Sequence, residues 1–74
     1  MPSKKEWIPK VGERVQLSKA GWQEGLVRSP KDAIAAQDMS ITEVEQMGPD
    51  AYAIEVTGPL NIYLLNNMTL ELKP

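Results

Sequence analysis

The stretch that decides the fold is Ala51-Tyr52-Ala53-Ile54-Glu55-Val56-Thr57-Gly58-Pro59-Leu60-Asn61-Ile62-Tyr63-Leu64-Leu65. In its first part, Tyr52, Ile54 and Val56 alternate with small or charged residues, which is the period-two pattern of a half-buried strand. A Gly-Pro pair then marks a turn, and a second apolar run follows it. The pattern predicts a β-hairpin whose strands are residues 51–56 and 60–65.

Shorter apolar runs on both sides of this hairpin predict further strands. Val15 and Leu17 share one face of the first of them. Ile41 and Val44 fall on opposite faces of another, which indicates either a β-bulge between them or a strand covered on both sides. The additional strands are expected at residues 11–17, 22–27 with a bend at Gly25, 39–47 and 69–72, and a single helical turn at residues 66–68.

One segment has helical rather than strand character. Ser29 is a good N-cap, Pro30 suits the first helical position, and Asp32 lies in the first turn, where the helix dipole favours a negative charge. A helix this short is unstable alone, so we expect Ile34 to pack it onto the body of the protein. A mobile loop over the same residues is the alternative.

Together these elements predict a mainly β protein, a small SH3-like five-stranded barrel with a short helical insertion at about residues 29–38. The barrel covers residues 11–74 as one domain, because a chain of 74 residues holds a single core. Residues 1–10 form an N-terminal arm that is either disordered or docked through Trp7. Gaps in the core are expected to be filled by three methionines, Met39, Met47 and Met68.

Residue counts exclude several kinds of chemistry. The chain has no cysteine and no histidine, which excludes disulfides, thiolate metal sites, a cysteine nucleophile and a Ser-His-Asp triad. No metal and no catalytic side chain are therefore expected. A net charge of −2 argues against nucleic acid as the main partner. The absence of an apolar run near about twenty residues predicts no membrane span, and without a visible export signal the expected location is cytoplasmic.

Four short strings carry a family resemblance. They are Gly12-Glu13-Arg14-Val15, Ala20-Gly21-Trp22-Gln23-x-Gly25-Leu26-Val27, Tyr52-Ala53-Ile54-Glu55 and Leu60-Asn61-Ile62-Tyr63. In this order they resemble the plasmid-type (type B), trimethoprim-insensitive dihydrofolate reductases, which are small SH3-like barrels. The resemblance covers roughly residues 11–28 and 51–72, and the region between them looks like an insertion.

The resemblance implies a homotetramer around a central pore that binds NADPH and dihydrofolate side by side. Asn61, Ile62 and Tyr63 would bind the cofactor, and Lys19 and Tyr63 would contact the substrate, with no side chain acting as a general acid. The chain departs from the family pattern in four ways, two of which are that the family's second tryptophan falls on Ser29 and that its interface histidine is missing. Leu60-Asn61 stands where the family has Val-Gln, and Lys19 is displaced from the position of the family's lysine.

The leading functional hypothesis is a non-catalytic SH3-like interaction or assembly module that binds proteins and needs no cofactor. We expect it to self-associate through residues 60–65, since a small core without disulfides or metals gains stability from oligomerisation. Trp22 is the candidate residue of its binding surface. The alternatives are an NADPH-dependent dihydrofolate reductase of the plasmid kind and a small docking subunit of an electron-transfer complex. Glu43 and Glu45, two apart on a strand, predict a solvated face rather than an acid–base pair.

Overall fold

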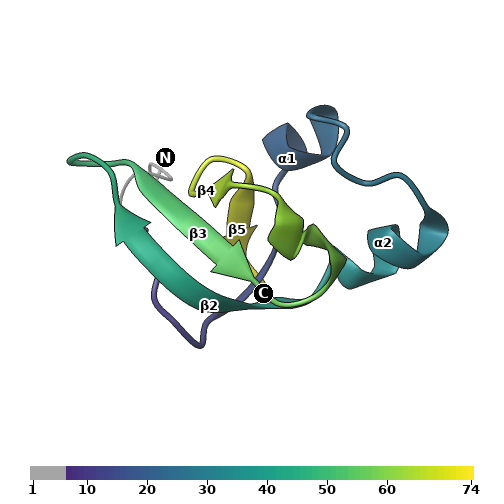
Figure 1. The fold of residues 1–74 in the computed structure, drawn as a ribbon, viewed down its shortest axis with the longest axis horizontal. Coiled ribbons are helices and arrows are strands. Elements are labelled where there is room, and N and C mark those ends of the chain that lie inside the picture. The colour runs from purple at the N-terminus through teal and green to yellow at the C-terminus, as the bar shows by residue number, and fades with distance from the viewer. Residues whose placement is uncertain (1–6) are drawn as a thin grey trace.

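The computed structural model describes residues 7–74, so residues 1–6 of the expected N-terminal arm lie outside the described residues. Short antiparallel strands make up most of the structure, with a few short helices between them (Figure 1). The mainly β class expected from the sequence is thus confirmed. The elements are β1 (Arg14–Leu17), α1 (Lys19–Gln23), α2 (Pro30–Ala35), β2 (Met39–Gln46), β3 (Tyr52–Val56), the 3-10 helix η2 (Pro59–Ile62), β4 (Leu65–Asn66) and β5 (Leu70–Leu72).

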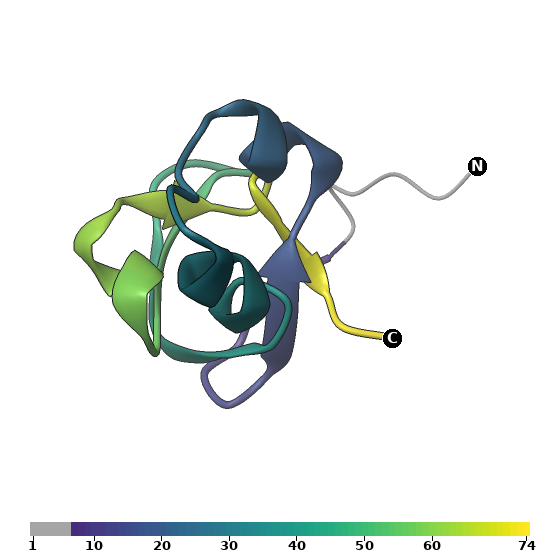
Figure 2. The same cartoon turned by 90° about the vertical axis from the view of Figure 1, so that its right-hand side faces the viewer.

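All five strands belong to one antiparallel sheet with the order β4-β3-β2-β1-β5. The sheet curls around the core, as Figure 2 shows. β4 and β5 form its two edges, and no pairing joins them within residues 7–74, so the five strands do not close into a barrel. The reason is local, because the backbone of Asn66 in β4 bonds to Thr69 in the following turn instead of to β5.

β2 and β3 form the longest hairpin of the sheet. Its register pairs Glu43 with Glu55 and Val44 with Ile54, and it shifts between Ile41 and Glu43. The shift is the β-bulge that the spacing of the apolar residues indicated. It allows Ile41 to be buried in the core while Val44 packs against the same core.

The core lies on the concave side of the sheet. Met39 is buried there, as expected, whereas Met47 and Met68 are 64% and 53% exposed. The expectation that these two methionines fill core gaps is therefore wrong. The buried apolar side chains of residues 7–74 are Val15, Leu17, Ala36, Met39, Ile41, Ile54, Val56, Leu60, Leu65 and Leu70.

Helix α1 replaces the strand expected at residues 22–27. The hydroxyl of Ser18 accepts a hydrogen bond from the Gly21 N–H at 3.2 Å and donates one to the carbonyl of Met68 at 2.6 Å. Gly21 lets the helix approach the turn after β4, because a Cβ there would lie 2.3 Å from the carbonyl oxygen of Thr69. This capping and close approach override the strand preference of the neighbouring apolar residues.

Helix α2 forms where the sequence predicted a helix. The hydroxyl of Ser29 accepts a hydrogen bond from the Asp32 N–H at 3.1 Å, which is an N-cap. The expectation that Ile34 packs this helix onto the body is wrong, since Ile34 is 72% exposed. Ala36 does so instead, because it is fully buried and its carbonyl accepts a hydrogen bond from the Leu17 N–H at 3.0 Å.

The prediction of a second hairpin strand at residues 60–65 is largely wrong. Gly58 has φ of 90° and Pro59 stands at the first position of η2, where a residue without an N–H is tolerated. The chain therefore enters a 3-10 helix and only β4 pairs with β3. The helical turn expected at residues 66–68 is a hydrogen-bonded turn at residues 67–69.

The described part of the N-terminal arm docks on the body through Trp7. Its ring is half-buried against the core, and its Nε1–H donates to Glu13 Oε1 at 3.3 Å. The same carboxylate oxygen accepts from the Lys10 N–H at 2.7 Å. Glu13 thus fixes both ends of this segment.

Candidate interaction surface

An open groove of about 520 Å³ lies between the tip of the β2–β3 hairpin and the turn that joins β4 to β5. We call it the hairpin groove. Its walls come from the ends of β2 and β3, from the chain just before β4, and from the turn after it. Its lining includes Glu45, Met47, Asp50, Tyr52, Leu64 and Met68.

The two walls of the groove are joined by the side chain of Asn67. Asn67 is buried, its Oδ1 accepts from the Tyr52 N–H at 3.2 Å, and its Nδ2 donates to the Asp50 carbonyl at 2.8 Å. Asn66 folds the turn on itself, because its Oδ1 accepts from the Met68 N–H at 2.8 Å. These bonds hold the turn and the hairpin at a fixed separation.

Apolar side chains are exposed around the groove. Leu64 is 82% exposed, and Met47 and Met68 are more than half exposed. Single exposed apolar residues are ordinary, but several beside one groove are typical of a docking surface. Methionine adapts its shape to an incoming group because its side chain is unbranched and flexible.

Carboxylates form an acidic border beside the groove, and two of them, Glu45 and Asp50, line it. Glu43, Glu45 and Glu55 lie on the outward face of the hairpin and are exposed, as predicted for a solvated face, and with Leu64 they line a second hollow of about 170 Å³. The register places Glu43 opposite Glu55. A hydrogen bond with Glu43, together with repulsion between the two charges, raises the pKa of Glu55. Asp50 adds a fourth carboxylate at the hairpin turn.

The edge of the sheet beside the groove is capped at Asn66. The N–H of Asn66 donates to Thr69 Oγ1 and its carbonyl accepts from Thr69, so these backbone groups face away from β3. These bonds leave no free backbone group on Asn66 for a strand of another chain.

The residues assigned from the family resemblance lie outside this groove. Asn61 and Ile62 are exposed on η2, and Tyr63 is half-buried against the core. Lys19 and Trp22 lie on α1, where Trp22 is 40% exposed. The segment that the resemblance would place along a pore as a strand is mostly a 3-10 helix. The part of residues 60–65 that does line the groove is its last two residues.

Comparison with known proteins assigns no function to this chain. The sequence matches no protein-family model, and no curated protein and no solved structure matches it. No helix in the described part of the chain is long and apolar enough to cross a membrane. Within residues 7–74 there is also no group of three or more acidic, histidine or cysteine residues that could hold a metal ion.

Proposed function

We propose that this protein is a non-catalytic, SH3-like interaction module that self-associates through the hairpin groove. The observation that carries the proposal is the exposure of Leu64, an apolar side chain that lines the groove and is 82% exposed. The strand order, in which β5 returns to pair with β1, supports an SH3-like architecture of a partly open kind.

A second copy of the chain is the partner that this surface favours. The core is small, and no disulfide reinforces it, because the chain has no cysteine. Burial of apolar surface stabilises by about 25 cal/mol per Å². An interface that covers Leu64, Met47 and Met68 therefore adds to the burial that a chain of this length lacks.

Molecular mass in solution tests the proposal. We expect light scattering to give a mass above that of the 8.2 kDa monomer, rising with concentration. Leu64→Glu places a charge in the groove and shifts the mass toward the monomer. Because Leu64 is exposed, this variant keeps its fold, which circular dichroism checks.

Val11→Glu is the matched control, since Val11 is 65% exposed and lies away from the groove. We expect this variant to associate as the wild-type chain does. A wild-type chain that stays monomeric at millimolar concentration contradicts the proposal.

The two alternative functions stay predictions. No observation in residues 7–74 specifically favours an NADPH-dependent dihydrofolate reductase or a docking subunit of an electron-transfer complex. NADPH fluorescence with the purified chain tests the first, and co-purification with a larger complex tests the second.

A further inference from the structure

The charges of the chain are distributed unevenly along it. Residues 39–72, which form the sheet from β2 to β5, contain no lysine and no arginine. The acidic border of the groove therefore has no cation on the elements that build it. A partner for this surface has to supply both apolar side chains and positive charge.

Helix α2 offers such a combination on its exposed side. Ile34 is 72% exposed, and Lys31 lies one turn before it on the same face. Lys73 Nζ donates to the carbonyl of Gln37 at 2.9 Å, which places a second cation just beyond the end of the helix. We call Lys31, Ile34 and Lys73 the α2 patch.

The acidic residues around α2 leave this patch cationic. Asp38 forms an ion pair and hydrogen bonds with Arg14, so these two charges offset each other. Asp32 lies in the first turn and its carboxylate is offset by the positive end of the helix. Arg28 precedes the helix and adds a further positive charge.

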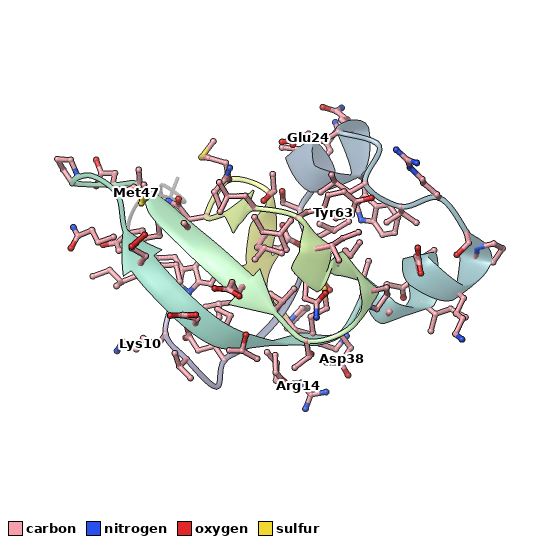
Figure 3. All side chains as sticks on the ribbon, viewed as in Figure 1. Lys10, Arg14, Glu24, Asp38, Met47 and Tyr63 are labelled. Atoms are coloured by element: carbon pink, nitrogen blue, oxygen red, sulfur yellow. The ribbon has the colours of Figure 1, made fainter. Side chains whose placement is uncertain are left out.

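The two surfaces lie at opposite ends of the molecule. The β2–β3 turn and α2 mark the two ends of the longest axis, which measures 34 Å (Figure 1). Met47 is labelled near the hairpin end in Figure 3, away from the helices. One chain can therefore bind a neighbour at each end without the two neighbours meeting.

We propose that the α2 patch of one copy docks into the hairpin groove of the next, so that the chain associates head to tail. The proposal rests on the proposed self-association and names the second surface that it uses. Ile34 enters the apolar groove beside Leu64, and Lys31 and Lys73 face the carboxylates of the border. α2 is short, about 9 Å long.

Electrostatics disfavours the symmetric arrangement. Two grooves facing each other bring the carboxylates of Glu43, Glu45 and Glu55 against the same three residues of the other copy. Like charges across an interface are unfavourable. A head-to-tail interface avoids this conflict, and it generates a ring where the rotation closes and a filament where it does not.

Mixing two variants tests the proposal. Leu64→Glu blocks the groove and Ile34→Glu blocks the α2 patch, and both positions are exposed enough to keep the fold. We expect each variant alone to be monomeric at a concentration where the wild-type chain associates. Their equimolar mixture should form a one-to-one dimer that grows no further, because one working groove meets one working α2 patch.

A charge exchange provides a second measurement. Glu45→Lys and Lys31→Glu should each weaken self-association by about tenfold, and the chain that carries both changes should regain it. Val11→Glu again serves as the control.

The other outcomes separate this inference from the proposed function. If Ile34→Glu associates like the wild-type chain while Leu64→Glu does not, head-to-tail docking is wrong and self-association stands. The same holds if both variants and their mixture stay monomeric while the wild-type chain associates. A monomeric wild-type chain overturns both proposals.

Discussion

Replacing Gly21 with alanine tests the contact that fixes α1 on the sheet. In an exposed helix this substitution stabilises, because glycine is about 1 kcal/mol less favourable than alanine. Here the new Cβ would lie 2.3 Å from the carbonyl oxygen of Thr69 and 2.8 Å from Leu17 Cδ2. The first of these atoms belongs to the backbone, so a side-chain rotation does not relieve the contact. We therefore expect the substitution to destabilise the protein.

The magnitude follows from the bonds beside the contact. Relief requires α1 to move by roughly 1 Å from the turn after β4, which stretches the bond from the Ser18 N–H to the Thr69 carbonyl, now 2.9 Å, and that from Ser18 Oγ to the Met68 carbonyl, now 2.6 Å. Overpacking costs about 1–3 kcal/mol, and a weakened buried hydrogen bond adds about 1 kcal/mol. With the helix gain subtracted, Gly21→Ala should lower the free energy of unfolding by about 2 kcal/mol.

Urea unfolding followed by circular dichroism measures this change. Domains of this length unfold with about 4–11 kcal/mol, so a loss of this size is a large share of the total. Ala20→Gly is the control, since Ala20 is exposed on the same helix and its replacement should cost only the propensity difference of about 1 kcal/mol. A Gly21→Ala chain as stable as the wild type would refute the close packing of α1 on the turn.

Two further substitutions test the wall and the border of the groove. Asn67→Ala leaves the Tyr52 N–H and the Asp50 carbonyl without their partner. The free energy of unfolding should fall by about 2 kcal/mol, and hydrogen exchange of the Tyr52 amide should become faster. An unchanged exchange rate contradicts the hydrogen bond from Tyr52 to Asn67. In the wild-type chain, the nearby carboxylate of Glu43 raises the pKa of Glu55. Glu55→Gln removes the Glu55 carboxylate and with it the repulsion between the two groups. A pKa raised in the folded state means that the wild-type chain loses stability as the pH rises through that pKa. Glu55→Gln should therefore be more stable than the wild type at about pH 7 and gain nothing at about pH 4, and thermal melts that differ equally at both pH values speak against the repulsion.

The sequence predicted the elements whose signals are local. The alternation of Tyr52, Ile54 and Val56 marks β3 because one face of that strand is buried. Ser29 and the proline after it mark the start of α2 because the cap is formed by residues within one turn. In both cases neighbouring residues determine the element, so the sequence predicts it without knowledge of distant contacts.

Other elements depend on contacts between distant residues. Ser18 is an N-cap signal like Ser29, but the packing of Gly21 on Thr69, far along the chain, makes α1 possible. The groove is an example. From the sequence alone, two adjacent leucines in a strand, Leu64 and Leu65, indicate only that one of them faces the core. The pairing of Leu65 with Ile54 decides which, and it leaves Leu64 exposed.

In the head-to-tail association that we propose, the acidic border makes the hairpin groove selective. The carboxylates of Glu43, Glu45 and Glu55 repel a partner that brings negative charge and favour one that brings cations. The α2 patch supplies two cations, Lys31 and Lys73, together with the exposed side chain of Ile34. Because two different surfaces then take part in assembly, a single substitution at either one is expected to stop growth.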